Sequence, residues 1–425
     1  MSLSFRPDPS ASCGLPGHTP AAADHSPARA AYVHWPFCQQ KCAYCDFISW
    51  PGRSRNDMGT YVELLKREIE AVGTWSRLHG LTVPLASVFF GGGTPSLADP
   101  ADLAAILELL RAQFGLEPDA EITLEANPGT LRPGQLDVLR AAGFNRISFG
   151  LQATQDSLLQ TLGRIHTYAD FLTSVRDARA AGFDRISADL MLGLPGQTLA
   201  DALESVERVL ALGIDHVSYY SLIIEPGTPF AERYLDRPDL LPDEDLERTI
   251  YHAVRNRLAD AGLLSYEISN AARPGQECRH NLVYWRGELY YGFGVAAHSY
   301  LAGIRRGNTD DWRTYSSVWG EAGGTQSRPG VREGAQWPFL ALESFEVIDP
   351  AEARKECFLL GLRLTQGVAW ADYQTRFGVD DDAHKRFAAE FHRLLDRGLI
   401  EIDDLGVRLT PLGLDLANQA FSEFV

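Results

Sequence analysis

The residues best suited to chemistry are three cysteines that lie close together near the start of the chain. Cys38, Cys42 and Cys45 follow the spacing C-x3-C-x2-C. Three thiolates from one short loop can hold a metal centre and leave one coordination position free, whereas four protein ligands would saturate it. An open position is typical of metal sites that do chemistry rather than scaffolding. The triplet therefore favours a reactive iron–sulfur centre.

Two other interpretations of the triplet stay open on spacing alone. A structural zinc ion could use the three thiolates together with His34 or a distant histidine as its fourth ligand. A disulfide is disfavoured, because three is an odd number and we expect no export signal in the first residues of the chain. The remaining cysteines, Cys13, Cys278 and Cys357, are scattered, which suits a reducing cytosol better than a disulfide framework.

Composition limits the classes of protein to consider. The chain has 425 residues, of which 45% are hydrophobic and 22% charged, as in an ordinary globular protein of two or three domains. A net charge of -17 disfavours nucleic-acid binding, which needs clustered Lys and Arg. No apolar run approaches the roughly 20 residues of a membrane span. Residues 1–29, rich in Ala, Ser and Pro, are predicted to be a disordered leader, and the protein is predicted to be cytoplasmic.

A repeated sequence indicates the fold. The segment AAGFNRIS at 141–148 recurs as AAGFDRIS at 180–187, more loosely at 211–218, and weakly at 261–266. Each copy places a glycine where a helix would end, because glycine readily takes the left-handed conformation there, and a short strand follows. Junctions repeated about every 30 to 40 residues are typical of successive strand–helix units.

The strands predicted between these helices suggest a parallel sheet. Six strands alternating with helices favour an α/β fold whose sheet is either open or curled into a partial barrel. In both arrangements, functional groups gather at the carboxyl ends of the strands. The predicted strands cover residues 31–34, 87–90, 121–125, 146–149, 185–190 and 216–221.

The residues at these strand ends describe a pocket for a small zwitterion. The triple glycine 91–93 lets backbone N–H groups approach a ligand, and it lacks the lysine of a phosphate-binding loop. Glu125 and Asp189 could accept hydrogen bonds from ammonium or ribose hydroxyl groups. Arg164 could pair with a carboxylate through two hydrogen bonds. S-adenosylmethionine carries all of these groups, and its amino and carboxylate groups could fill the open iron position.

The ordered motifs resemble one family across residues 30–425. Besides the cysteine triplet they are GGGTPS at 91–96, LEANP at 124–128, GLQ at 150–152, LGRIH at 162–166 and ADLMLGLPGQT at 188–198. Together they resemble the radical S-adenosylmethionine superfamily, and more narrowly the branch that contains the oxygen-independent coproporphyrinogen III oxidase and the HemW-type heme chaperones. The resemblance implies a partial (β/α)6 barrel, similar to a TIM barrel, with a C-terminal domain.

The resemblance also implies the roles of individual residues. Cys38, Cys42 and Cys45 would hold a [4Fe-4S] cluster whose fourth iron chelates S-adenosylmethionine. In the family, one-electron reduction of the sulfonium gives methionine and a 5′-deoxyadenosyl radical, so the cofactor carries the chemistry and no protein residue is assigned a catalytic role. The other implied cofactor contacts are Tyr32, Gly92, Gly93, Thr94, Glu125, Gln152, Arg164 and Asp189.

Two features favour the chaperone branch over the oxidase. The oxidase has a further cysteine in a C-x3-C-x2-C-x-C pattern, whereas here Asp46 and Phe47 follow the triplet. The segment His280, Asn281, Tyr284 and Trp285 matches the H-N-x-x-Y-W motif associated with heme binding. A histidine is an ordinary axial ligand of heme iron, and the aromatic rings offer flat apolar surface for a porphyrin. Two alternatives stay open: that the histidine is a satisfied polar residue among core aromatics, and that Cys278 is the ligand.

These observations lead to a functional hypothesis. We expect a heme chaperone that transfers heme to an apo-hemoprotein acceptor; the alternative is a radical enzyme that oxidatively decarboxylates a porphyrinogen. Heme, the acceptor and a heme donor are the expected partners, and a homodimer and peripheral contact with membrane hemoproteins stay open. Helical patterns at 356–362, 369–377 and 382–397, followed by two short strands at 399–402 and 407–409, predict a winged-helix-like C-terminal part. A docking or lid role is expected for it, because it is acidic and lacks a basic recognition helix. The expected domains after the leader are 30–230, 231–348 and 349–425.

Overall fold

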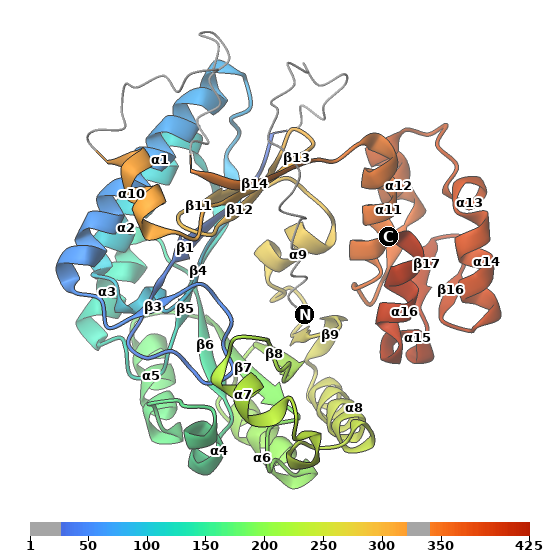
Figure 1. The fold of residues 1–425 in the computed structure, drawn as a ribbon, viewed down its shortest axis with the longest axis horizontal. Coiled ribbons are helices and arrows are strands. Elements are labelled where there is room, and N and C mark those ends of the chain that lie inside the picture. Colours follow the sequence, from blue (N-terminus) through green and yellow to red (C-terminus); the bar gives the residue numbers. More distant parts are fainter. Residues whose placement is uncertain (1–26, 321–340) are drawn as a thin grey trace.

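The computed structural model describes residues 27–320 and 341–425. At its centre is a curved nine-stranded sheet with the order β11-β1-β4-β5-β6-β7-β8-β10-β9 (Figure 1). The strands from β11 to β8 run parallel, and β10 and β9 are antiparallel additions beyond β8. Six of the parallel strands are those predicted: β1 Ala30–Trp35, β4 Leu85–Gly92, β5 Leu116–Ala126, β6 Arg146–Gln152, β7 Arg185–Leu192 and β8 His216–Ser221.

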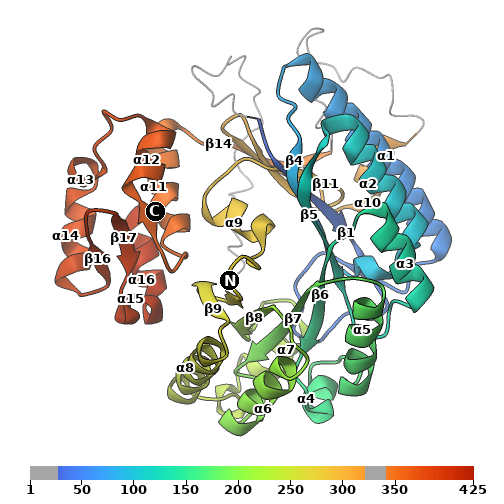
Figure 2. The same cartoon turned by 180° about the vertical axis from the view of Figure 1, so that it is seen from behind.

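Helices cover the outer face of the curved sheet (Figure 2). They connect consecutive parallel strands, as the repeated junctions predicted, and they leave the inner face to other parts of the chain. Those that cover the face are α1 Arg55–Leu78, α2 Pro100–Phe114, α3 Pro133–Ala142, α5 Tyr168–Ala180 and α6 Leu199–Leu210.

The glycines of the repeated junctions have the predicted backbone conformation. Gly143, Gly182, Gly213 and Gly262 have φ values of +115°, +88°, +66° and +81°. A side chain would be strained at such angles, so glycine lets each helix end and the chain turn into the next strand or loop. The repeat therefore predicted the βα architecture through a local steric requirement.

The two faces of the sheet differ in polarity, because successive side chains of a strand point to opposite sides. On β6, Ile147 and Phe149 are buried in the main hydrophobic core. Arg146 and Ser148, which alternate with them, line a cavity on the inner face. The sheet thus has an apolar outer face under the helices and a polar inner face that is available for chemistry.

The segment after β8 adds elements to both edges of the sheet and to its inner side. Helix α8 Glu244–Asp260 leads to β9 Leu264–Glu267 and β10 Asn270–Ala272 at one edge, and β11 Tyr291–Phe293 pairs with β1 at the other. Between them, α9 Arg279–Trp285 lies on the inner side of the curved sheet (Figures 1 and 2). A second, antiparallel sheet follows, formed by β12 His298–Leu301, β13 Ile304–Asn308 and β14 Leu342–Val347.

The C-terminal unit has its own hydrophobic core, centred on residues such as Phe358, Phe391 and Leu394. Helices precede an antiparallel hairpin, as predicted, but a third strand joins the hairpin. The segment 382–397, predicted as one helix, is divided by a break at Phe387. The elements are α11 Pro350–Gly361, β15 Val368–Ala369, α12 Trp370–Phe377, α13 Ala383–Arg386, α14 Ala388–Asp396, β16 Ile400–Ile402, β17 Gly406–Leu409, α15 Pro411–Asp415 and α16 Ala417–Phe421.

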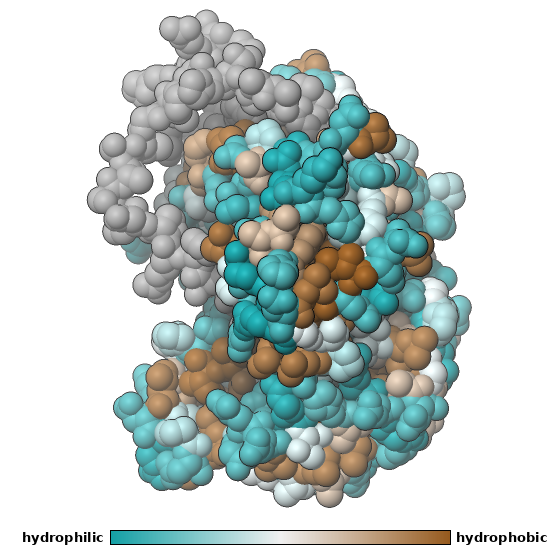
Figure 3. Space-filling model, turned by 90° about the vertical axis from the view of Figure 1, so that its right-hand side faces the viewer, coloured by the Kyte–Doolittle hydropathy of each residue, from teal (hydrophilic) through white to brown (hydrophobic). Residues whose placement is uncertain are grey.

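The exposed face on the C-terminal side is a mosaic of hydrophilic and hydrophobic residues (Figure 3). None of the helices in the described ranges is both long and apolar enough to cross a membrane. The leader predicted for residues 1–29 lies outside the described residues except for its last three, and Cys13 lies outside them as well.

Candidate functional site

A cavity of about 430 Å³ lies against the inner face of the sheet. It extends from the cysteine loop past the carboxyl ends of the parallel strands and into the interior of the curved sheet. Most of the residues predicted from sequence line it, namely Cys38, Cys42, Cys45, Gly92, Gly93, Thr94, Glu125, Gln152, Arg164, Asp189 and Asn281. Tyr32, His280, Tyr284 and Trp285 do not.

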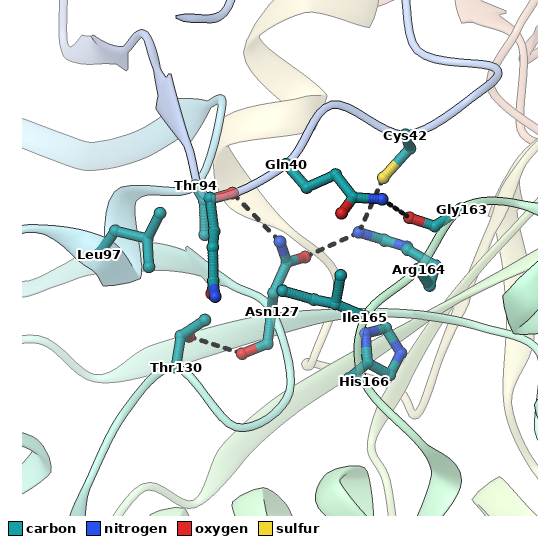
Figure 4. A pocket seen from close by; sticks show the side chains of 11 residues that line it. Gln40, Cys42, Thr94, Leu97, Asn127, Thr130, Gly163, Arg164, Ile165 and His166 are labelled. Atoms are coloured by element: carbon teal, nitrogen blue, oxygen red, sulfur yellow. Dashed lines mark hydrogen bonds between the residues drawn. The ribbon is translucent and has the colours of Figure 1, made fainter. Parts of the chain in front are cut away.

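The cysteine loop is held in place by the segments that follow β6 and β8. The backbone N–H of Ala43 donates to the carbonyl of Leu162 at 3.0 Å, and the N–H of Phe230 donates to the carbonyl of Ala43 at 2.9 Å. The side-chain amide of Gln40 donates to the carbonyl of Gly163 at 3.1 Å (Figure 4). The three thiols of the loop are partly buried and form no disulfide. The loop is instead held by hydrogen bonds of Gln40 and Ala43, which lie between the cysteines in sequence.

The electrostatics of the loop suit a cationic iron cluster. Burial raises the pKa of the Cys45 thiol to about 11, and the nearby Cys42 and Cys38 raise it further. Three thiolates together are therefore unfavourable unless a metal centre supplies positive charge. Among the described residues, no three His, Cys, Asp or Glu side chains are placed to hold a single metal ion. Three thiols on one loop fit a cluster, in which each thiolate holds a different iron.

The glycine loop after β4 is required by packing as well as by access to the cavity. Gly92 has a φ of +106°, and a Cβ atom there would lie 2.5 Å from the ring of His34. A Cβ atom on Gly93 would lie 2.7 Å from the carbonyl oxygen of Phe37. The N–H of Gly92 donates to Glu125 at 3.2 Å. The glycines therefore let the loop pass close to β1 and the cysteine loop.

Two carboxyl groups face the middle of the cavity. Burial raises the pKa of Glu125 to about 8, the charge of Asp189 raises it further, and the N–H of Gly92 opposes the shift. Burial also raises the pKa of Asp189, against hydrogen bonds from Ser218 and Ser148, the latter at 3.2 Å. A ligand with an ammonium group and hydroxyl groups would stabilise both carboxylates. S-adenosylmethionine carries these groups, so the residues present fit it.

Arg164 makes different contacts from those predicted. Its Nη1 donates to Asn127 at 3.0 Å and lies 3.6 Å from the sulfur of Cys42 (Figure 4). Its Nη2 donates to the carbonyl of Gly150 at 2.9 Å. Both terminal nitrogens are therefore used inside the protein, where they tie β6 to the cysteine loop. Bidentate pairing of this arginine with a ligand carboxylate stays a prediction, and the geometry adds a positioning role.

Gln152 ends β6 in a strained conformation. Its φ is +73°, which is uncommon for a residue with a side chain, and the pairing of β6 with β7 shifts register just before it. Its side-chain oxygen accepts a hydrogen bond from Tyr220 at 3.0 Å. Backbone strain of this kind persists where surrounding contacts enforce it, often at binding sites. The strain agrees with a binding role for Gln152.

The H-N-x-x-Y-W motif forms α9, and most of its side chains turn away from the cavity. His280 is only 1% exposed. One ring nitrogen bonds to Ser87 at 3.0 Å and the other to Tyr284 at 2.9 Å, so neither is left for iron. The ring stacks on Phe89 with 5.2 Å between the centroids, and burial lowers the pKa of His280 to about 4. This geometry corresponds to the satisfied polar residue among aromatics; heme ligation at His280 would require these bonds to break.

The remaining predicted residues and the sequence alternatives also have defined surroundings. The hydroxyl of Tyr32 bonds to His34 at 3.0 Å, behind the glycine loop. The guanidinium of Arg363 lies 4.3 Å from the centre of the Trp285 ring, where α9 meets the C-terminal unit. Cys278 is buried beside Glu121, with 3.5 Å between its sulfur and a carboxylate oxygen, so it does not face the cavity either.

Among the residues of the site that the sequence predictions missed, two have clear roles. Asn127 donates to Thr94 at 3.1 Å and accepts from Arg164, so it joins the glycine loop to the arginine that contacts Cys42. It follows β5 directly, and the rule that functional groups gather at strand ends could have found it. Arg146 also lines the cavity, but it begins a strand. That rule therefore points away from it.

Comparisons with known proteins agree with this geometry. The model of the radical SAM superfamily matches residues 32–209, and the model of the HemN C-terminal domain matches residues 348–416. The heme chaperone HemW of Bacillus subtilis (strain 168) is 35% identical over 93% of this chain and 99% of its own length. The heme chaperone HemW of Synechocystis is 39% identical over 80% of this chain and 79% of its own.

A solved structure shows the same fold. The coproporphyrinogen III oxidase HemN from Escherichia coli superposes with a TM-score of 0.77, covering 95% of this chain and 91% of its own, at 23% identity. The agreement confirms the predicted radical SAM architecture with a C-terminal domain. At this identity, the likeness concerns the fold and not the reaction.

Proposed function

This chain belongs to the HemW family of the radical S-adenosylmethionine superfamily, and from that membership we propose that it binds heme and passes it to an apo-hemoprotein. The observation that carries the proposal is similarity to heme chaperones over nearly the whole chain, at 35% identity for the relative from Bacillus subtilis. The replacement of the oxidase's next cysteine by Phe47 after Asp46 supports the same branch.

The proposal includes a cluster and S-adenosylmethionine in the cavity. Cys38, Cys42 and Cys45 would hold the cluster, and Glu125 and Asp189 would bind the ammonium and ribose groups of S-adenosylmethionine. When bound, the pair supplies one-electron reduction of the sulfonium. The other proposed contacts are Tyr32 behind the glycine loop, and Gly92, Gly93, Thr94, Gln152 and Arg164 at the cavity wall.

A second function has a specific observation in its favour. The cavity retains the whole set of cofactor residues next to the cysteine loop, which a protein that only carries heme would not need for that task. Oxidative decarboxylation of a porphyrinogen would use that set. We place this reaction second because the chain resembles heme chaperones at higher identity than it resembles the oxidase of known structure.

The proposal also covers partners and organisation. Heme, an apo-hemoprotein acceptor and a heme donor would be the partners, in the cytoplasm, and the unit from residue 349 onward would dock the acceptor or cover the site. The preceding units would be a barrel at 30–230 and an extension at 231–348. A homodimer and contact with membrane hemoproteins belong to the same proposal and are tested by sedimentation with and without heme-protein-containing vesicles.

One anaerobic experiment separates the two functions. The cluster is reconstituted, and the protein is given either heme alone, or coproporphyrinogen III with S-adenosylmethionine and a reductant. The chaperone proposal expects stoichiometric heme binding, transfer of that heme to an apo-hemoprotein, and no loss of carboxyl groups from the porphyrinogen. Multiple turnovers to protoporphyrinogen would replace the proposal with the second function. A protein without its cluster, the Cys42→Ala variant, controls for reaction that does not depend on the site.

A further inference from the structure

The cavity has an inner end that the cofactor residues do not account for. We call this part of the cavity the inner end, and its lining residues are Arg146, His216, Asn270 and Asn281. Arg146 is the first residue of β6 and Gln152 the last, so the cavity follows this strand for about 20 Å. In the sheet register Arg146 pairs with Thr123, two residues before Glu125 on β5. The inner end therefore lies deeper than the carboxyl groups that face the middle of the cavity.

Arg146 is a buried cation that has no direct hydrogen-bond or ion-pair partner among the described residues, although the carboxylates of Glu121 and Asp189 act on it through their charge. Its exposed fraction is 2%, and within residues 27–320 and 341–425 its guanidinium makes no hydrogen bond and no ion pair. Its register neighbour Arg185 shows the usual arrangement, with an ion pair to Glu121 at 2.8 Å and a hydrogen bond to the carbonyl of Glu277 at 3.0 Å. Burying a guanidinium without such contacts is costly, which indicates that another group completes the site.

The surrounding residues leave the charge of Arg146 available. Glu121 on β5 acts on Arg146 through its charge, but it makes its direct contacts with Arg185 and with the backbone N–H groups of Arg279 and His280, both at 3.2 Å. His216 bonds to Ser187 and Tyr266 through its two ring nitrogens, and burial keeps its pKa well below the usual value. It is therefore neutral and adds no charge of either sign.

Asn281 approaches the same end from α9. It is the one member of the H-N-x-x-Y-W motif that lines the cavity, and its side-chain amide has no hydrogen-bond partner among the described residues. An asparagine amide offers two N–H donors. Asn270 contributes a buried side-chain oxygen that also has no partner in the described part of the chain. Unused donors and an unused acceptor thus line the same cavity as the guanidinium.

We infer that Arg146 and Asn281 form a subsite for a carboxylate of the bound ligand. A guanidinium binds a carboxylate through two parallel hydrogen bonds, and a neutral amide can add a third. The identification of the ligand rests on the proposed function: the propionate groups of heme are carboxylates. S-adenosylmethionine carries a carboxylate as well, so the experiment must distinguish the two sources. The inference also gives the asparagine of the motif a direct role that its histidine lacks in this geometry.

The test compares acids with matched neutral analogues. Calorimetric titrations use cluster-reconstituted wild type, Arg146→Gln and Arg176→Gln, with heme, heme dimethyl ester, S-adenosylmethionine and its decarboxylated analogue. We expect Arg146→Gln to weaken heme about 10- to 100-fold and to leave the ester unchanged, because only the acid loses a charged hydrogen bond. Arg176→Gln is the control, since that guanidinium is exposed, paired with Asp177 and outside the cavity, and it should not separate acid from ester.

Each other result has a defined meaning. If Arg146→Gln loses the preference for the acid over its neutral analogue with S-adenosylmethionine but not with heme, the subsite is supported and the carboxylate it binds comes from the cofactor. Equal weakening of acid and neutral analogue, or no change for any of the four ligands, overturns the inference and leaves Arg146 as a counter-charge for Glu121, Glu125 and Asp189. If the wild type binds no heme, the proposed function fails, while the two S-adenosyl ligands still decide the subsite.

Two further variants cover a folding defect. If Arg146→Gln loses its fold by circular dichroism, Arg146→Lys keeps the charge and should retain a weakened preference for the acid. Asn281→Ala, at a position whose side chain makes no hydrogen bond within the described ranges, should reduce the preference for the acid about threefold. An unchanged preference in both variants counts against the subsite.

Discussion

The cysteine loop and helix α9 both carry motifs that predict ligand binding, but they present their residues differently. The three thiols of the loop line the cavity, and the contacts that fix the loop are made by residues between them. In α9 the imidazole of His280 uses both nitrogens inside the protein, and only Asn281 reaches the cavity. A motif of ligand-type residues therefore specifies a ligand site only where the fold leaves its polar atoms unpaired.

The largest effect should come from the loop. Cys42→Ala removes one thiolate from a set that offers three, and we expect nearly complete loss of iron and acid-labile sulfide per chain. The fold itself should persist, because the loop is held through Ala43 and Phe230. Cys357→Ala, a partly buried cysteine of the C-terminal unit, is the control and should keep its iron. Full iron content in Cys42→Ala would contradict the cluster assignment.

His280→Ala should act mainly on stability. The substitution removes a buried ring and leaves the hydroxyls of Ser87 and Tyr284 without partners, so we expect the free energy of unfolding to fall by about 3 kcal/mol in urea titrations. His392→Ala, whose side chain is 77% exposed, should change it little. Loss of the heme Soret band with unchanged stability would instead make His280 an iron ligand and remove the contrast between the two regions.

Glu125→Gln should change the pH dependence of stability in the ligand-free protein. The pKa of Glu125 rises from 4.5 to about 8 on folding, so the folded state holds the extra proton between these values. The stability that this proton contributes to the folded state is fully present below about pH 4.5 and is lost as the pH rises through about 8. Glutamine cannot ionise, so the variant does not lose this stability. Its free energy of unfolding relative to wild type should therefore rise by on the order of 2 kcal/mol between pH 5 and pH 9.

The measurement for Glu125→Gln is a series of urea titrations across that pH range. Glu232→Gln, at an exposed position, is the matched control. Added S-adenosylmethionine should reduce the difference, because its ammonium group would stabilise the carboxylate. A difference that does not depend on pH would show that Glu125 ionises normally and that this part of the cavity is better solvated than the structure indicates.

The smallest effect tests the α9 region most directly. Tyr284→Phe removes the hydroxyl that bonds to the imidazole of His280 at 2.9 Å, and should cost about 1 kcal/mol of stability. It also frees one ring nitrogen. If heme binding requires that nitrogen, the variant should bind heme more tightly than wild type; unchanged affinity in the titration would place the iron ligand elsewhere.

Much of the fold could be predicted because its signals are local. The glycines at 143, 182, 213 and 262 mark positions where the backbone needs a positive φ, and the strands between them follow. The antiparallel pairing of β9 and β10 was not predicted, because these short strands lack an alternating pattern and join the sheet through contacts distant in sequence. The break at Phe387 was missed because the helical pattern continues across it.

The candidate site was predictable to a similar extent. Glu125 and Asp189 were found because they sit at the ends of parallel strands, which meet at one edge of the sheet. Arg164 was expected to face a ligand, but its contacts with Asn127 and Gly150 depend on how distant loops pack. Arg146 was missed, since nothing in its neighbourhood in sequence distinguishes a paired arginine from an unpaired one.

The sequence by itself determined the residue types, the cysteine spacing and the glycines that make the parallel sheet and its loops. These depend on covalent geometry and on neighbours along the chain, so they can be recognised without coordinates. Only the tertiary structure decided which polar atoms are left unpaired at the cavity. The thiols, Arg146 and Asn281 face it with bonding capacity to spare, and His280 does not. Hydrogen-bond satisfaction is a property of the packed chain, because the partners come from segments far apart in sequence.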